Sequence, residues 1–330
     1  MRHGPAPQPR LEFPQAPRLT ADLSAELIAV LVAVTDGEPR VLTLHQATTL
    51  PSGPFAGTDR SLQASLRAWV ERQTGHPLGY VEQLYTFADR DRTGEAGSPY
   101  AGPVIGISYL GLTRETRVSD GYEASWQGWY RYFPWEDQRT GPDTARPALT
   151  ARLHGWADDA AGETERASRR QRVMLTFGAV RPVGNDAGAW NEELVLQRYE
   201  LLFEAGLVPE AGRPGKAALI GVAMLHDHRR ILATAIARLR AKIKYRPVVF
   251  ELVPDDFTLL QLQRVFEAVT GRLLHKQNFR RLIDQQGLVE ETGVLATDTG
   301  GRPAKLYRFK RSVLQERAVS GTKLPLSRSR

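Results

Sequence analysis

One segment near the carboxyl end, residues 256–309, constrains the fold of this chain more than any other. Thr258 followed by Gln261 is a capping-box pattern, which marks the start of a helix. Apolar residues then recur at helical spacing until Gly271, a residue that commonly ends helices. After a short turn, residues 275–283 fit a second helix with one apolar face. The segment therefore begins with two helices joined by a tight turn.

Two short apolar runs follow the second helix, at residues 287–289 and 306–309. A polar, Gly-rich tip at residues 297–302 separates them, which is the order expected of a β-hairpin. A helix, a turn, a second helix and a hairpin predict a winged helix-turn-helix.

The second helix presents side chains that suit DNA. Its polar positions are His275, Lys276, Gln277, Asn278, Arg280 and Arg281. Arg and Lys neutralise phosphates, and Asn, Gln and Arg can make paired hydrogen bonds to base edges in the major groove. The hairpin adds Arg302 and Lys305, which we expect at the phosphate backbone or in an adjacent minor groove. We predict binding to a double-stranded DNA operator; the alternative is a solvated basic face on a protein-interaction adaptor.

Charge supports this prediction. Residues 245–330 hold fifteen Lys and Arg against nine Asp and Glu, so nearly all of the net charge of +7 lies in the last quarter of the chain.

The chain has no cysteine, which excludes disulfides and thiolate metal sites. No stretch approaches the roughly 20 apolar residues that cross a membrane. We therefore expect a cytoplasmic protein without a membrane partner.

The first half of the chain reads as a mixed sheet-and-helix domain. The expected order is a disordered Pro- and Arg-rich arm at residues 1–20, a hairpin at 25–44 around Asp36–Gly37, a helix at 61–73, and strands at 80–87 and 104–112. Leu62, Leu66, Trp69 and Val70 are expected to face inward from that helix, which Gly75 ends.

The middle of the chain alternates apolar and polar segments. We predict a strand at residues 130–133, a long polar loop at 137–169, a strand at 172–180, a helix at 191–205, a long helix at 227–242 and an extended connector at 245–253. The long helix places its apolar residues on one side and Arg229, Arg230, Arg238, Arg240 and Lys242 on the other. His226 and His228 lack an obvious third metal ligand, so a helix cap by Asp227 between them is preferred.

The hairpin, the helix and the segment 80–92 (YVEQLYTFADRDR) resemble the Nudix fold. That family's motif is G-x5-E-x7-R-E-U-x-E-E-x-G-U, where U is aliphatic and the glutamates hold divalent cations. Aligned on Gly75, the motif's other fixed positions fall on Pro54, Arg60, Ala68, Trp69, Arg72 and Gln73. A shift of one residue recovers Asp59, Arg67 and Glu71 but loses the glycine. Either register leaves too few carboxylates for Mg²⁺, so we expect no metal site, no catalytic residues and no enzyme.

A degenerate Nudix domain followed by a winged helix is the layout of the Nudix-related transcriptional regulators of NAD metabolism. The resemblance covers residues 27–112 and 224–309, and its most specific parts lie at 80–87, 225–247, 257–281 and 301–309. The segment between these two regions is longer than in the compact members of the family. In this respect the chain looks like the longer, alphaproteobacterial type of regulator. The implied fold class is α+β, with a Nudix-like α/β/α sandwich at residues 21–243, an insertion at 135–223, a winged helix at 244–312 and a basic tail at 313–330.

By this resemblance, the chain is a homodimeric repressor of NAD-synthesis genes. It needs no cofactor, and ADP-ribose, NAD or ATP acts as its effector. Tyr85 and Phe87 alternate on one strand and are candidates to stack on the nucleotide, whereas Glu82 is expected on the opposite face. Arg90 and Arg92 follow and are candidates for its phosphates. Core packing of the two aromatic residues and a solvated loop for the two arginines are the alternatives. A working Nudix hydrolase of ADP-ribose or a dinucleotide is the rival function.

Overall fold

The computed structural model describes residues 24–55, 60–88, 104–116, 118, 121–139, 145–178, 190–212, 217–243, 247–296 and 303–310. The predicted arm and tail, together with Arg90, Arg92 and Arg302, lie outside these ranges.

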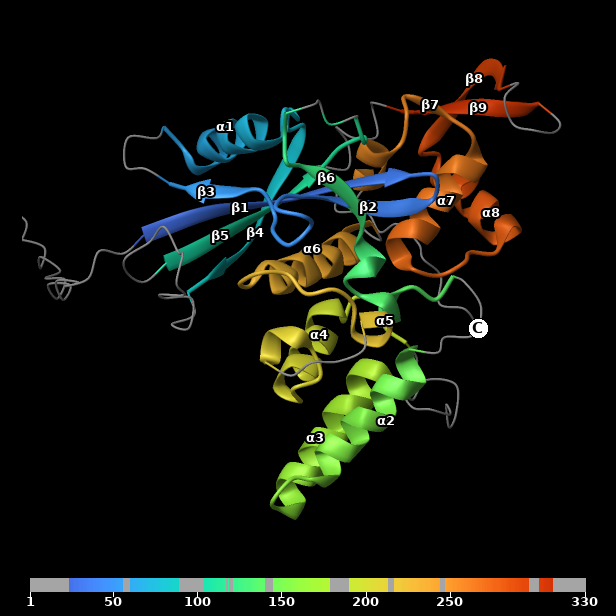
Figure 1. Ribbon diagram of the computed structural model, residues 1–330. Helices are drawn as coiled ribbons and strands as arrows, with labels where there is room; N and C mark the ends of the chain where they lie inside the picture. Colours follow the sequence, from blue (N-terminus) through green and yellow to red (C-terminus); the bar gives the residue numbers. More distant parts are fainter. Residues whose placement is uncertain are drawn as a thin grey trace, which may run out of the picture.

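A central mixed sheet organises the first part of the chain (Figure 1). Its strands are β1 (Ser24–Thr35), β2 (Glu38–Thr43), β3 (Ser52–Pro54), β4 (Tyr80–Phe87), β5 (Val104–Leu112) and β6 (Ser125–Gly128). The order is β4-β5-β1-β2-β6, β3 also pairs with β1, and only the β1–β5 pair is parallel. Asp36 and Gly37 have φ values of 52° and 75°, which give the tight turn with positive φ that closes a two-residue hairpin. The predicted hairpin and both later strands are confirmed.

Helices cover both faces of this sheet. Leu27, Ala29 and Leu31 of β1 pack toward α1 (Leu62–Thr74). The alternate residues of the strand, Ile28, Val30 and Val32, pack on the other side, where α6 (His228–Ile243) lies. A strand buried on both faces reads as a continuous apolar run, as β1 does. The layers therefore form an α/β/α sandwich.

The middle of the chain corrects three predictions. The expected strand at residues 130–133 overlaps a 3₁₀ helix, η2 (Trp129–Arg131), which is followed by η3 (Pro134–Glu136). The expected loop contains α2 (Ala145–Asp158), and the expected strand at 172–180 begins inside α3 (Glu163–Phe177). In α3, Val173 and Phe177 are buried one turn apart while Met174 and Leu175 are exposed. An apolar run of this kind fits either structure, and here helical spacing decides which residues are buried.

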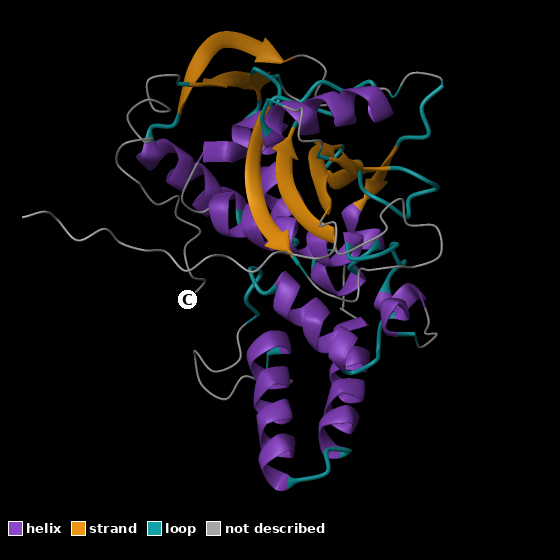
Figure 2. Cartoon of the chain, turned by 90° about the vertical axis from the view of Figure 1, so that its left-hand side faces the viewer, coloured by secondary structure: helices purple, strands orange, loops and turns teal. Residues whose placement is uncertain are grey.

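The helices α2 and α3 project from the body as an antiparallel pair (Figure 2). Between this pair and the sheet lie α4 (Val195–Glu204), η4 (Pro209–Ala211) and α5 (Ala217–Ile220), and the helix predicted at residues 191–205 is thereby confirmed. The expected extended connector is a 3₁₀ helix instead, η5 (Pro247–Leu252). No helix in the described part of the chain is both long and apolar enough to cross a membrane.

The carboxyl-terminal elements have the predicted order. They are β7 (Asp256–Phe257), α7 (Leu259–Thr270), α8 (Lys276–Gln286), β8 (Val289–Ala296) and β9 (Ala304–Phe309), with a three-stranded sheet in the order β7-β9-β8. The capping box at the start of α7 forms in both directions, at 3.1 Å from the Gln261 amide to Thr258 and 2.7 Å from the Thr258 amide to Gln261. Gly271 ends α7 with a φ of 75°. A helix-turn-helix followed by a β-hairpin wing is therefore present.

Candidate nucleic-acid interface and effector site

The second helix of the helix-turn-helix, α8, is seated on α7 by two buried side chains. Phe279 packs edge-on against Phe266 of α7 with ring centroids 5.5 Å apart, and Ile283 lies one turn later. This packing fixes which side of α8 meets the protein. The opposite side faces outward.

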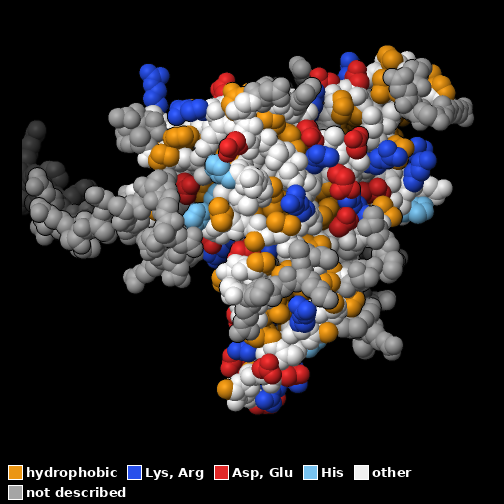
Figure 3. Space-filling model, viewed as in Figure 1, with side chains coloured by type: hydrophobic (Ala, Val, Ile, Leu, Met, Phe, Trp, Pro, Cys, Tyr) orange, Lys and Arg blue, Asp and Glu red, His pale blue; other side chains and the backbone are white. Residues whose placement is uncertain are grey.

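The structure leaves the six predicted DNA-binding side chains of this segment accessible from outside the protein. His275, Lys276, Gln277, Asn278, Arg280 and Arg281 are all exposed. Figure 3 shows Lys and Arg side chains gathered with a His at the edge of the molecule formed by α8. Within the described part of the chain, no hydrogen bond or ion pair holds any of the six side chains. Their donors and acceptors are therefore available to another molecule.

The amino end of α8 adds a positive potential of its own. His275 is the N-cap and makes no side-chain capping bond, and no acidic residue lies in the first turn. The first backbone N–H groups of a helix have no partner within the helix, and its dipole favours anions at this end. A phosphate group is thus suited to the start of α8.

The wing differs from α8 because Lys305 and Arg308, on its described strand β9, are already paired. The Lys305 ammonium lies 2.9 Å from both carboxylate oxygens of Glu291, and Arg308 lies 2.7 Å from Glu290. The hydrogen bond from Lys305 lowers the pKa of Glu291, and the same bond raises the pKa of Lys305. Lys305, predicted as a DNA contact, is therefore held by a carboxylate. Strand register gives the signal that sequence reasoning missed, since Glu291 lies opposite Tyr307 and Lys305 is two residues away.

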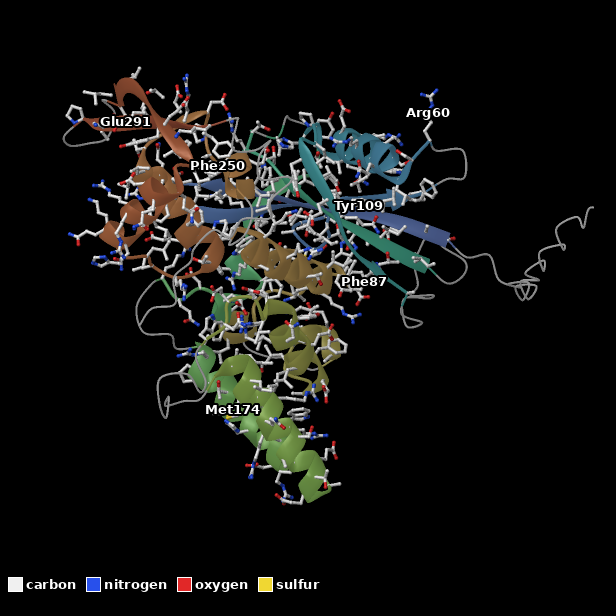
Figure 4. The ribbon with its side chains drawn as sticks, turned by 180° about the vertical axis from the view of Figure 1, so that it is seen from behind. Arg60, Phe87, Tyr109, Met174, Phe250 and Glu291 are labelled. Carbon is white, nitrogen blue, oxygen red and sulfur yellow. The ribbon has the colours of Figure 1, made fainter. Side chains whose placement is uncertain are left out.

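The candidate effector strand β4 brings Tyr85 and Phe87 together. Their ring centroids lie 6.3 Å apart. Phe87 is only 7% exposed, with the Arg230 guanidinium of α6 at 5.3 Å from its ring centroid, whereas Tyr85 is 63% exposed. Figure 4 shows Phe87 and Tyr109 on the sheet, between the elements that cover it. Phe87 is therefore packed in the core, which was the alternative to nucleotide stacking. Tyr85 is the aromatic side chain of the pair that a ligand can reach.

A bulge in β4 overturns the expectation for Glu82. The register against β5 shifts between Gln83 and Thr86, and the Ser108 hydroxyl donates to the Tyr85 carbonyl at 2.8 Å inside the bulge. Because one extra residue reverses the alternation of faces, Glu82 lies on the α6 side together with Phe87. Glu82 forms ion pairs there with Arg238, at 3.5 Å, and with Lys242.

Helix α1 occupies the place of the motif helix but carries other chemistry. The Trp69 indole donates to the Pro54 carbonyl at 3.0 Å, and the Gln73 amide exchanges two hydrogen bonds with the backbone of Ser52, at 2.7 and 3.1 Å. The Arg72 guanidinium lies over the Trp69 ring at 4.6 Å. These side chains brace β3 against α1. An indole, an amide and a guanidinium do not fit a divalent cation, which prefers carboxylate oxygens.

Clusters of His, Asp and Glu give no further candidate. Among the residues whose placement is described, no group of three or more such side chains could hold a metal ion. His228 is buried, and its Nδ1 accepts a hydrogen bond from the Leu50 amide at 2.7 Å. This histidine therefore joins α6 to the loop before β3.

Comparisons with known proteins agree with this architecture. Residues 249–309 match the family model described as the NrtR DNA-binding winged helix domain. The ADPR responsive transcriptional repressor NtrR of Acinetobacter baylyi is 43% identical over 83 residues, which are 25% of this chain and 33% of that protein. The match thus spans about a third of the relative's length.

Two crystal structures of Shewanella oneidensis NrtR are similar along most of the chain. One is of the protein complexed with a 27mer DNA. Each is 19% identical, covers 88% of this chain and 95% of its own, and has a TM-score of 0.51. At this identity the likeness concerns the fold, and it confirms the predicted α+β class with a Nudix-like sandwich and a winged helix. Residues 249–309 are an NrtR-type DNA-binding winged helix domain.

Proposed function

We propose that this chain is a DNA-binding transcriptional repressor of NAD-biosynthesis genes, controlled by an NAD-related nucleotide. One observation carries the proposal: a helix-turn-helix of NrtR type presents six polar and cationic side chains on α8 that no described residue engages. A protein-interaction adaptor does not require this combination of a seated second helix, an uncapped amino end and unpaired cations.

In this function, α8 lies in the major groove and its side chains divide into two groups. Gln277, Asn278 and Arg280 are the types that bond base edges and read sequence. Lys276 and Arg281 neutralise phosphates, the His275 ring can hydrogen-bond one, and these contacts fix the position of the helix. The resemblance implies a homodimer, in which two copies of α8 reach half-sites roughly 34 Å apart, one turn of DNA.

The effector belongs to the Nudix-like domain, residues 21–243, and the DNA to residues 244–312. ADP-ribose is the first candidate because the Acinetobacter relative is named as ADPR responsive, and NAD and ATP are the others. Tyr85 supplies an exposed ring for stacking on the base, and Phe87 supports it from below. Arg90 and Arg92, outside the described residues, are proposed for the phosphates. The chemistry of α1 argues for a regulator without a metal cofactor.

The decisive experiment measures binding of the full chain to the DNA upstream of its own gene by fluorescence anisotropy. ADP-ribose, NAD and ATP are titrated into the complex. We expect saturable, sequence-specific binding that one of these nucleotides weakens. Coupling is reciprocal, so the same nucleotide must bind less tightly in the presence of operator. Nucleotide affinity that is equal with and without operator would refute control by that nucleotide.

A parallel assay addresses the rival function. The chain is incubated with ADP-ribose and Mg²⁺, and release of AMP is followed by chromatography. Rapid cation-dependent hydrolysis, with no retention on any promoter fragment, would establish a Nudix hydrolase and end the repressor proposal.

A further inference from the structure

The turn between α7 and α8 is held by residues from the upstream part of the chain. The Tyr130 hydroxyl donates to the Ala268 carbonyl at 2.7 Å, the Arg240 Nε donates to the Val269 carbonyl at 2.8 Å, and the Gln138 amide donates to the Gly271 carbonyl at 2.7 Å. The last carbonyls of a helix have no partner within it. Here, the sheet-and-helix domain supplies partners that a free helix-turn-helix takes from water.

Arg240 is also held by partners outside the helix-turn-helix. Its side chain has no exposed surface, and its Nη1 nitrogen lies 2.5 Å from Glu136 Oε2 and 3.0 Å from the Glu192 carbonyl. Glu136 in turn bonds Arg198 of α4 at 2.6 and 2.9 Å. A planar guanidinium donates along fixed directions, so these partners set its orientation. Arg240 therefore points at the end of α7 with little freedom.

The turn also fits closely against η3. A Cβ on Gly271 would lie 2.2 Å from the Glu136 carbonyl oxygen and 3.0 Å from Arg240, and the φ of this residue is 75°. Only glycine satisfies both the left-handed backbone and this close approach. The position of α8 is thus set from α6 and η3 as well as by its packing on α7.

The same helix, α6, contacts the candidate effector strand. Lys242 pairs with Glu82 of β4, and the Arg230 guanidinium lies over the Phe87 ring at 5.3 Å. Helix α6 therefore touches β4 with some of its cations and the end of α7 with Arg240. A displacement of β4 can reach the DNA-binding turn through one rigid element.

We propose that Arg240 is a positioning residue for α8: it holds the carboxyl end of α7 to α6 and passes movements of α6 to the DNA-binding surface. Arg240 itself touches no DNA. The inference rests on the proposed function for what α8 contacts and for the nucleotide that moves β4. Its structural part, the clamp on the turn, is independent of both.

Arg240→Lys tests the clamp in the full-length protein. Lysine keeps the charge beside Glu136, but its donors all lie on one nitrogen, whereas Arg240 bonds the Val269 carbonyl through Nε and the Glu192 carbonyl through Nη1. We expect amide hydrogen exchange at residues 271–279 to become faster than in the wild-type protein. Arg152→Lys, at an exposed position on α2, is the matched control and should leave exchange there unchanged. Unchanged exchange in folded Arg240→Lys would overturn the proposal.

The functional consequence is measured on the same variants. We expect Arg240→Lys to reduce the effect of nucleotide on operator affinity by about 2- to 30-fold, the range seen along coupling networks. The salt dependence of DNA binding should stay constant, because no phosphate contact is lost. A nucleotide response equal to that of the wild type would contradict the role of Arg240 in coupling.

A second variant covers the case in which Arg240→Lys does not fold. Tyr130→Phe removes one hydroxyl and leaves the Ala268 carbonyl without its donor. We expect faster exchange at residues 271–279, in the same direction but smaller, and no change would refute the clamp. If wild-type protein binds no operator, the proposed function fails while the exchange experiments still decide the clamp.

Discussion

Two basic helices of this chain, α6 and α8, look alike in composition and differ in what their charges do. In α6 each of the five cations that the sequence placed on one polar side has a carboxylate partner, and two of them, Arg229 and Arg240, are fully buried. The pairs are Arg229–Glu210, Arg230–Glu200, Arg238–Glu82, Arg240–Glu136 and Lys242–Glu82. In α8, no described residue pairs with Lys276, Arg280 or Arg281.

The difference separates cations that build the protein from cations offered to a ligand. Buried charges need partners, because an unpaired ion in the interior is costly. Exposed cations without a partner are free to exchange their counterions for phosphates. A basic helix therefore indicates nucleic acid only where its side chains stay exposed and unpaired, as in α8.

The largest expected effect comes from breaking the pairing of α6. Glu136→Ala leaves both Arg198 and Arg240 buried without their carboxylate, and removal of one partner of a buried ion pair costs about 3–5 kcal/mol. We expect a melting temperature lower by several degrees in calorimetry. The control is Glu165→Ala, which removes the exposed partner of Arg169 on α3 and should change stability by about 0.5 kcal/mol or less. If the two variants lost the same stability, burial of an ion pair would not decide how much its carboxylate contributes.

Acidification should weaken the same cluster. Burial by itself raises the pKa of Glu136, but Arg198 and Arg240 outweigh it and hold the pKa below the ordinary value of 4.5. A carboxyl group with a lowered folded-state pKa adds stability above its unfolded pKa, and that stability is lost as the pH falls through the folded value. We expect Glu136→Gln to show less loss of melting temperature between pH 5 and pH 2 than the wild type. If the melting temperatures of the two proteins fell in parallel as the pH is lowered, Glu136 would not be the group whose protonation destabilises the fold.

Arg280→Ala tests the other side of the comparison. A base contact from arginine discriminates by about 1–3 kcal/mol, so preference for operator over unrelated DNA should fall by roughly 5- to 150-fold. Arg238→Ala on α6, whose partner is Glu82, should leave the preference of the nucleotide-free protein unchanged. An unaltered preference in Arg280→Ala would mean that α8 is not the reading helix.

Lys276→Ala should act on affinity rather than on preference. Loss of one phosphate contact reduces the slope of log Kd against log salt by about 0.9 and weakens all sequences alike. Anisotropy titrations at several salt concentrations on operator and unrelated DNA measure both quantities. A loss confined to the operator would instead assign Lys276 to a base.

Local patterns predicted much of this fold because local chemistry decided it. The Asp36–Gly37 turn, the Thr258–Gln261 capping box and the glycine at position 271 each fix backbone geometry within a few residues. The strands at residues 80–87 and 104–112 have the predicted limits. The exposed face of α8 was likewise readable, since Phe279 and Ile283 lie four residues apart.

The errors arose where distant residues decide. The burial of Arg229 and Arg240 depends on Glu210 and Glu136, and Glu136 is 104 residues from Arg240. The exchange of faces at Glu82 depends on a bulge bonded to Ser108 of the neighbouring strand. The apolar run in α3 resembles a strand until its packing is known. In each case, the residues that decide the structure lie far along the chain, so the local sequence does not reveal them.

The smallest expected effect concerns the wing, where Lys305 and Arg308 resemble the cations of α6 in being paired. Glu291→Gln removes the carboxylate beside Lys305 and frees its ammonium. Exposed ion pairs are weak, so folding should be nearly unaffected. If the wing lies against DNA, the freed Lys305 strengthens binding to all sequences and steepens the salt slope by up to about 0.9. Glu165→Gln, on helix α3 away from the winged helix, controls for net charge. Weaker binding by Glu291→Gln would show that Glu291 orients Lys305 toward DNA. The wing would then resemble α8 in using its cations to contact DNA.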